Sequence, residues 1–435
     1  METYIDTSSL VKRESPVTKE LQALIDLAAE EGKTLLFPKG TYLIGPLFFR
    51  SHSHVLFEKG ATFLGSEKEE DYPLIDTRIA GIEMKGYPGI FNLIDVKDVV
   101  LEGEGTINGQ GKRWYIKYWG EDQKGGMRKE YDARGIRWAC DYDCLRPKNI
   151  LIQNSKDIRI DSLTLLSSPF WNLHVLYSNG ITLKSLKILS EDPNSPSTDG
   201  IDIDSSFEVL IKGCIISTND DGISIKSGRD SDGLRVNKPS HDIRIENCLF
   251  QRGYGLSIGS ELSGGIYDIS GRNLRFEGSS CAFRIKSSRS RKGYVKDIHL
   301  SNILIHNTQY PFYLYLDWNP LYNKNILPKD FIGEIPPHYK KLLEPVKESL
   351  KDTEVSDLCF ENVQVSSSPS YTIPTTLFTF SGFPSSPIKD VVFKCLNATI
   401  SEYGSFKYCE EPNLRFCNIK VTSNYQSVPG SFDNR

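Results

Sequence analysis

The sequence of 435 residues predicts an all-β protein with a single domain, a right-handed parallel β-helix (a solenoid) closed at its N-terminal end by a helix. Three observations support this fold class. A short strand pattern recurs along the chain, a second strand pattern accompanies it, and an amphipathic helical segment precedes both. All-β folds of this length often form one unit, so we treat residues 1–435 as a single domain.

The first pattern begins with Asp, Glu, Gly or Asn and continues as a run of alternating apolar residues. The runs are short, rich in Ile, Val and Leu, and alternate with period 2, which is typical of strands rather than helices. Copies of the pattern begin at residues 157, 180, 208, 242, 297, 357, 390 and 413. The repeat predicts short strands stacked coil on coil, about 4.8 Å apart.

The second pattern includes "DGIDID" from residue 199 and "DGISIK" from residue 221. Ile201 and Ile203 share one face of the strand, and Asp202 and Asp204 share the other. Later copies begin at residues 254, 282 and 311. Stacking therefore predicts that residues one coil apart in sequence become neighbours in space.

The stacking predicts that three aspartates lie close together. Asp199 is expected near Asp221, with Asp220 beside it. Asp199 has the parity of a buried residue, so we expect Gly200 and Gly222 to bend the chain and turn the carboxylates outward.

The remaining segments do not follow the repeat. Residues 17–32 have apolar positions at helical spacing and end in Gly32, which predicts a helix that caps the open end of the stack. Residues 111–145 are aromatic and charged and are predicted to form a long loop. Residues 317–356 contain several prolines and a short helical segment. Both insertions are expected to wall a cleft.

Composition excludes several functional classes. The formal charge of −4 gives no basic field for nucleic acid, and no apolar run is long enough to span a membrane. The first residues show no secretory signal, which predicts a cytoplasmic protein, although a secreted chain that had lost its leader would look the same. The nine cysteines form no disulfide framework, and we expect neither a metal nor a cofactor. The sequence does not specify the oligomeric state.

Neighbouring carboxylates predict acid–base chemistry. A like charge nearby raises the pKa of one carboxyl, which then keeps its proton near neutral pH. One protonated and one ionised carboxyl are what glycosidic cleavage requires. Arg284 and Lys286, on a following coil, would suit a sugar that carries its own carboxylate.

The chain resembles glycoside hydrolase family 28, the polygalacturonase family, and in particular its bacterial and plant exo-type branch. The resemblance covers residues 17–320 and depends on four ordered motifs: "STDGID" (197–202), "NDDGISIKSG" (219–228), "GYGLSIGSE" (253–261) and "FRIKS" (283–287). It implies an inverting hydrolase of α-linked galacturonic acid with pectic oligosaccharides or polysaccharides as substrate.

Roles follow from the same resemblance. Asp220 matches the general acid, and Asp199 and Asp221 match the pair that activates water. Arg284 and Lys286 match the residues that hold the uronate carboxylate. Inversion predicts that acid and base lie roughly 6.5–9.5 Å apart.

Two departures from the family pattern favour a variant substrate, such as a rhamnogalacturonan-type linkage or a substituted oligogalacturonide. Tyr254 replaces the usual His of Gly-His-Gly, and Trp318 stands where a Tyr is usual. Arg229 is predicted either to contact substrate or to be a surface charge, and His174 is predicted to line the cleft.

Two other functions remain open from the sequence. A polysaccharide lyase would need a Ca²⁺ cage and a basic residue for proton abstraction, and a non-catalytic pectin-binding β-helix would explain the missing His. A cytoplasmic hydrolase would meet only short oligosaccharides, and insertions could block one end of the cleft, so exo-action is expected.

Overall fold

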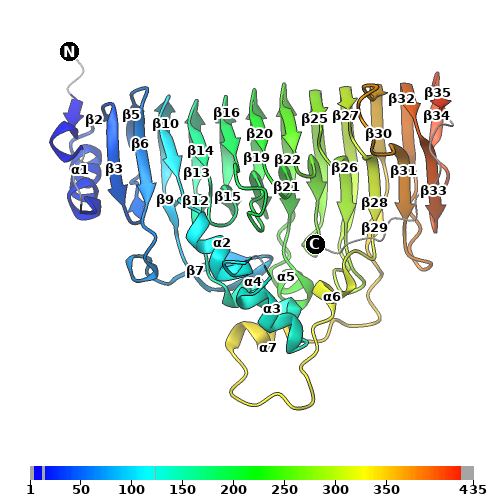
Figure 1. The fold of residues 1–435 in the computed structure, drawn as a ribbon, viewed down its shortest axis with the longest axis horizontal. Coiled ribbons are helices and arrows are strands. Elements are labelled where there is room, and N and C mark those ends of the chain that lie inside the picture. The colour runs from blue at the N-terminus through cyan, green and yellow to red at the C-terminus, as the bar shows by residue number, and fades with distance from the viewer. Residues whose placement is uncertain (1–3, 12–14, 123, 423–435) are drawn as a thin grey trace.

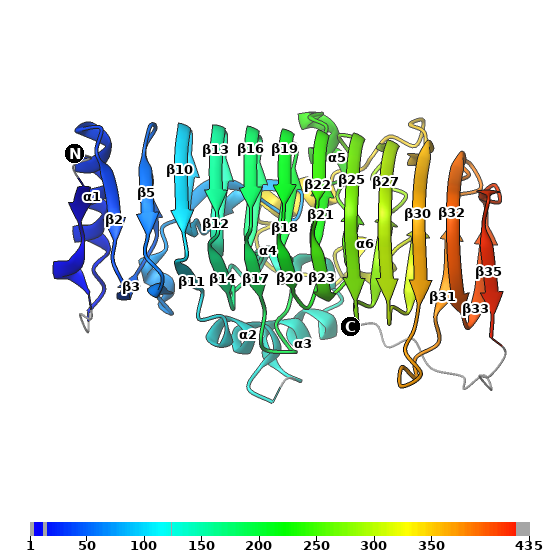
Figure 2. The ribbon, with the colours of Figure 1, turned by 90° about the horizontal axis from the view of Figure 1, so that it is seen from above.

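A computed structural model describes residues 4–11, 15–122 and 124–422. The chain forms a right-handed parallel β-helix, as predicted, with coils that follow one another from the N-terminal to the C-terminal end (Figures 1 and 2). The larger sheet contains β1 (Tyr4–Asp6), β2 (Thr34–Phe37), β3 (Gly40–Ile44), β5 (His54–Phe57), β6 (Ala61–Gly65), β10 (Lys97–Gly103), β11 (Thr106–Asn108), β13 (Lys156–Asp161), β14 (Thr164–Leu166), β16 (Asn179–Lys184), β17 (Lys187–Leu189), β19 (Phe207–Lys212), β20 (Ile215–Ser217), β22 (His241–Glu246), β23 (Leu249–Arg252), β25 (Ile266–Glu277), β27 (Tyr294–His306), β29 (Glu354–Val355), β30 (Leu358–Ser366), β32 (Val391–Ile400), β34 (Asn413–Arg415) and β35 (Asn418–Val421).

The second sheet carries the aspartate strands. Its members are β4 (Leu47–Phe48), β9 (Gly89–Ile94), β12 (Lys148–Gln153), β15 (Leu173–Leu176), β18 (Ile201–Asp204), β21 (Ile223–Lys226), β24 (Leu256–Ile258), β26 (Cys281–Lys286), β28 (Tyr310–Tyr315), β31 (Thr376–Ser381) and β33 (Glu402–Lys407). Neighbouring strands pair in parallel. Ile201 lies opposite Ile223, and Ile223 opposite Leu256.

These stacked residues form the buried core, and the alternate positions face outward. Ile201, Ile223 and Leu256 are fully buried. Asp202 lies opposite Ser224 on the outward row, which continues through Ser257 to Arg284. The period-2 pattern of the sequence therefore decides which residues of these strands pack in the core and which turn away from it.

The N-terminal end is capped as predicted. Helix α1 (Thr18–Glu30) buries Leu21, Ile25 and Ala28 against the first coils. This apolar face covers the end of the core, which would otherwise be open to solvent. No helix in the described part of the chain is long and apolar enough to cross a membrane.

The segment 111–145 is not a loop, so that prediction was wrong. It contains α2 (Lys112–Trp119), α3 (Gly126–Ala133), η3 (Arg137–Ala139) and α4 (Cys140–Asp143). The second insertion contains α6 (Pro320–Asn323) and α7 (Pro337–Leu343). The remaining short elements lie elsewhere in the chain. They are α5 (Asp230–Val236), η1 (Ser8–Leu10), η2 (Glu69–Asp71) and the antiparallel hairpin of β7 (Ile75–Ile79) and β8 (Ile82–Gly86).

The insertions form a hydrophobic core of their own beside the solenoid. Trp138 and Tyr142 from the first insertion, Tyr339 and Leu342 from the second, and Ile82 from the β7–β8 hairpin are buried in it. Helices α2 to α7 consequently gather on one side of the strands (Figure 1). The aromatic residues that looked irregular against the strand repeat are the ones that pack this second core.

Candidate active site

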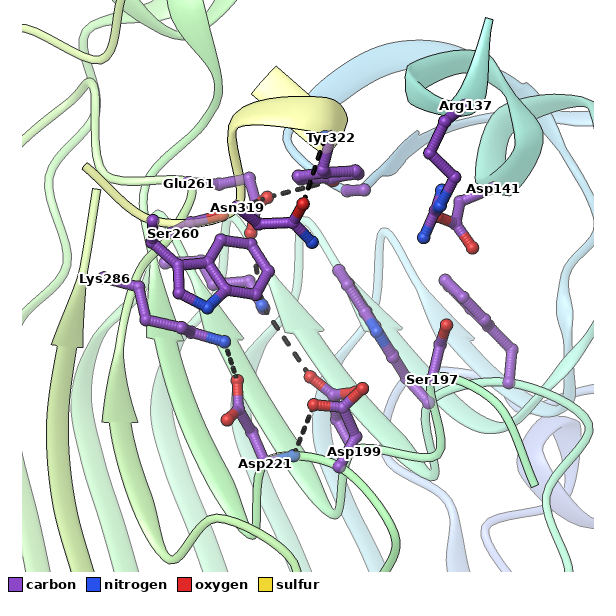
Figure 3. Close-up of a pocket in the computed structure, with 16 residues that line it drawn as sticks. Arg137, Asp141, Ser197, Asp199, Asp221, Ser260, Glu261, Lys286, Asn319 and Tyr322 are labelled. Carbon is purple, nitrogen blue, oxygen red and sulfur yellow. Dashed lines mark hydrogen bonds and ion pairs between the residues drawn. The ribbon is translucent and has the colours of Figure 1, made fainter. Parts of the chain in front are cut away.

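The three aspartates meet in one pocket, next to the strands β18 and β21. One carboxylate oxygen from each of Asp199, Asp220 and Asp221 lies within 4.8 Å of the others. Asp199 and Asp221 are buried, whereas the Asp220 side chain is 37% exposed. All three line a pocket of about 100 Å³, drawn in Figure 3, which has room for several water-sized groups.

The glycines beside the aspartates are required by close backbone contact. A Cβ atom on Gly200 would lie 2.3 Å from the carbonyl oxygen of Gly222 on the next coil. A Cβ atom on Gly222 would similarly meet the ring of Phe250 at 2.6 Å. The repeated Asp-Gly therefore lets two coils approach closely enough for their carboxylates to share one site.

Asp221 is the ionised member of the group. Lys286 Nζ donates to its Oδ2 at 2.7 Å, and Arg284 Nε donates to its Oδ1 at 3.0 Å. Burial raises the pKa of Asp221, but the charges of Arg284 and Lys286 outweigh burial and hold it well below its usual range. Ser257 donates a further hydrogen bond to the same carboxylate.

The pKa values of Asp220 and Asp199 shift in the opposite direction to that of Asp221. Partial burial and the charge of Asp221 raise the pKa of Asp220. Burial, followed by the charges of Asp202 and Asp220, raises the pKa of Asp199 well above its usual range. The site therefore holds carboxyls whose pKa values are shifted in opposite directions, and Asp220 is the one with a raised pKa that has most access to solvent.

The acids are closer together than predicted. Their nearest oxygens lie within 4.8 Å, below the roughly 6.5–9.5 Å expected between the two carboxyl groups of an inverting enzyme. That prediction of separation was wrong. Asp220 directly precedes Asp221 in the chain, and Asp199 stands opposite Asp221 on the neighbouring coil, about 4.8 Å away, so the acid and both water-activating residues come close together.

Tyr254 and Trp318 both contact the basic residues. The Arg284 guanidinium lies 3.8 Å from the centroid of the Tyr254 ring, and Lys286 Nζ lies 4.7 Å from that of Trp318. Trp318 and Lys286 line the pocket directly. Arg284 and Tyr254 stand behind Asp221 and do not belong to the lining.

Arg229 lies elsewhere than predicted, since it neither lines the pocket nor faces solvent. It is fully buried and donates to the Tyr142 hydroxyl at 2.8 Å and to the Tyr322 carbonyl at 2.8 Å. It also lies 4.3 Å from the centroid of the Tyr322 ring. Arg229 therefore joins both insertions to the solenoid, because its five donors suit several partners at once.

His174 is also buried and does not line the pocket. Its register opposite Asp202 places it on the outward face, as its parity indicates. However, its ring is fully covered and lies edge-on to Trp171, with centroids 4.9 Å apart. Burial lowers the pKa of His174 to about 4, so the ring is neutral near pH 7.

Sequence reasoning missed several lining residues. Lys226 lies 3.2 Å from Glu261 and 3.7 Å from Asp199, and its outward parity in "GISIK" could have indicated it. The others lie outside β18 and β21, and among them only Ser197 and Ser260 fall in a quoted motif. They are Ala80, Arg137, Asp141, Phe170, Trp171, Ser197, Ser260, Asn319 and Tyr322.

A parallel β-helix with adjoining carboxyls whose pKa values shift in opposite directions, beside an Arg–Lys pair, fits the class of glycoside hydrolases. The particular family follows from comparison with known proteins. Residues 30–326 match the model of glycosyl hydrolases family 28, and the chain belongs to that family.

Individual relatives agree with this assignment. The chain is 30% identical over 311 residues to a probable polygalacturonase of Vitis vinifera, covering 70% of this chain but 59% of that protein. It is 26% identical over 310 residues to an endo-polygalacturonase of Pectobacterium parmentieri, covering 68% of this chain and 71% of the other. An exopolygalacturonase structure from Thermotoga maritima shares the fold, with a TM-score of 0.76, 21% identity, and coverage of 95% of this chain and 92% of that one. This chain thus spans about three fifths of the Vitis protein.

Proposed function

We propose that this protein hydrolyses pectic oligosaccharides and removes galacturonic acid from their ends. The observation that carries the proposal is the pocket in which Asp220, Asp199 and Asp221 meet beside Lys286. Family membership supports a pectic substrate, and the basic residues support a sugar that carries a carboxylate.

In this mechanism Asp220 protonates the oxygen of the leaving sugar. Its raised pKa supplies the proton, and its partial exposure gives the substrate access. Asp199 and Asp221 hold a water molecule, Asp199 positioning it and Asp221 taking its proton, which would produce inversion at the anomeric carbon. Because the acids lie so close together, the anomeric configuration of the product should be measured directly.

The pairing of Asp221 suggests how substrate activates the site. With Arg284 and Lys286 bound to it, Asp221 is too weakly basic to take a proton. A uronate carboxylate would compete with Asp221 for Lys286, the cation of this pair that lines the pocket. The base would then gain strength when the correct sugar arrives.

Exo-action is supported by the walls of the pocket. Ala80 from the β7–β8 turn, Arg137 and Asp141 from the first insertion, and Asn319 and Tyr322 from the second lie in its lining. Segments outside the coil repeat therefore limit the length of chain that fits. Tyr254 in place of His extends the proposal to rhamnogalacturonan-type or substituted oligogalacturonides.

A panel of defined pectic oligosaccharides, with products read by mass and by NMR of the new anomeric centre, tests the proposal. Release of single galacturonate units from one end would support it. An unsaturated product that absorbs in the ultraviolet would instead indicate a lyase. Binding without release of reducing ends would indicate a non-catalytic β-helix.

The lyase alternative is less well supported by the site. The acid cluster of Asp199, Asp220 and Asp221 is the one group in the described residues that could cage a cation. Arg284 and Lys286 already neutralise Asp221 there, so their charges would oppose the binding of Ca²⁺.

A further inference from the structure

Arg137 places a guanidinium in the pocket wall opposite Lys286. It comes from η3 in the first insertion, and its side chain is 14% exposed where it meets the pocket. Figure 3 shows Arg137 and Lys286 reaching in from different sides of the pocket. The Tyr322 ring centroid lies 5.6 Å from the Arg137 guanidinium carbon and limits the contact of Arg137 with water.

The positive charge of Arg137 is not fully balanced by the protein. Its ion-pair partner Asp141, 3.0 Å away, is shared with Arg146 at 3.4 Å. The other acceptors of Arg146 are neutral, namely the carbonyls of Pro169 and Pro196 and the hydroxyl of Ser197. One carboxylate thus serves two guanidinium groups, and this wall of the pocket carries surplus positive charge.

The position of Arg137 relative to the acids indicates which sugar it would meet. In the proposed function, Lys286 holds one uronate carboxylate beside the acids, and Arg137 lies across the pocket from it. A sugar that contacts Arg137 is therefore the neighbour of that uronate, across the bond that is cleaved. Because residues of both insertions line the pocket there, we place the terminal sugar of the proposed exo-action at Arg137.

We infer that Arg137 binds the carboxylate of the terminal uronate and selects galacturonate over neutral sugars at that position. This inference rests on the proposed function for its orientation. Arginine suits the task because its planar fork holds a carboxylate through two parallel hydrogen bonds. The pocket would then bind one sugar carboxylate on each side of the scissile bond.

Calorimetric titration with galacturonate and with galactose tests this inference, since the two sugars differ in the carboxylate. Arg137→Gln is expected to weaken galacturonate binding roughly tenfold to a hundredfold and to leave galactose binding unchanged. Arg137→Lys keeps the charge but loses the fork, and should fall between wild type and Arg137→Gln. Arg134→Gln is the matched control, because Arg134 is 47% exposed and pairs with Glu130.

Two results would overturn the inference. One is a preference for galacturonate that is as large in Arg137→Gln as in wild type, and the other is an equal loss for both sugars in Arg137→Lys with an unchanged melting temperature. Monosaccharide binding needs no turnover, so it is separate from the test of hydrolysis. If wild type cleaves oligogalacturonides but Arg137→Gln keeps the preference, the inference alone fails. If wild type shows the Arg137-dependent preference but cleaves nothing, the proposed hydrolysis fails, and the contact between Arg137 and a uronate carboxylate stands without its orientation.

Discussion

The guanidinium of Arg284 lies flat against Tyr254, 3.8 Å from the ring centroid, while it bonds Asp221. The ring therefore fixes a cation that neutralises a catalytic candidate. A tyrosine can do this through its π face and needs no positive charge of its own. The substitution of Tyr for His is thus compatible with an ordered acid site, since Arg284 supplies the charge.

Substitutions at Tyr254 should separate the contribution of its ring to activity from that of its hydroxyl. Tyr254→Phe keeps the face that Arg284 contacts, and we expect kcat/KM within about threefold of wild type. Tyr254→Ala removes a contact of about 0.5–2 kcal/mol and should lower kcat/KM several-fold to thirtyfold. Steady-state kinetics on an oligogalacturonide measures both, and equal losses in the two variants would show that the hydroxyl matters instead.

Asp220→Asn should remove the general acid without disturbing the fold. Turnover is expected to fall about 10²–10⁴-fold, because the leaving sugar loses its proton donor. The melting temperature should stay near that of wild type, since the Asp220 side chain is 37% exposed. Asp98→Asn, at a side chain that is 70% exposed, is the control. Full activity in Asp220→Asn would end its assignment as the acid.

Lys286→Met should move the pH profile of kcat/KM upward. Lys286 lowers the pKa of both Asp220 and Asp221 in the free protein, so its removal raises both. The alkaline limb, where Asp220 loses its proton, and the acid limb, where Asp221 gains one, should then both shift to higher pH. A profile measured well below saturation checks this, and a downward shift of the alkaline limb would contradict the assignment of Asp220.

Arg229→Met distinguishes a structural role from substrate binding. Arg229 is fully buried between Tyr142 and the chain at Tyr322, so its loss should destabilise the protein by about 3–5 kcal/mol. Thermal and denaturant unfolding measure this effect. A variant that keeps wild-type stability but loses affinity for substrate would restore the sequence prediction that Arg229 contacts the sugar.

The sequence alone determined the coil, the cap and the meeting of the three aspartates. These features follow from short-range rules, because parallel stacking places residues one coil apart side by side, as for Asp199 and Asp221. The parity of each strand also identified Arg284 and Lys286 as outward-facing.

Only the tertiary structure decided what covers that outward face. His174 has outward parity yet is fully buried, and Arg229 holds the insertions instead of facing the pocket. Arg137 reaches the pocket from a segment that was predicted to be a loop. The physical reason is that the insertions pack through a separate core of residues far apart in sequence, and no repeat encodes which of them meet.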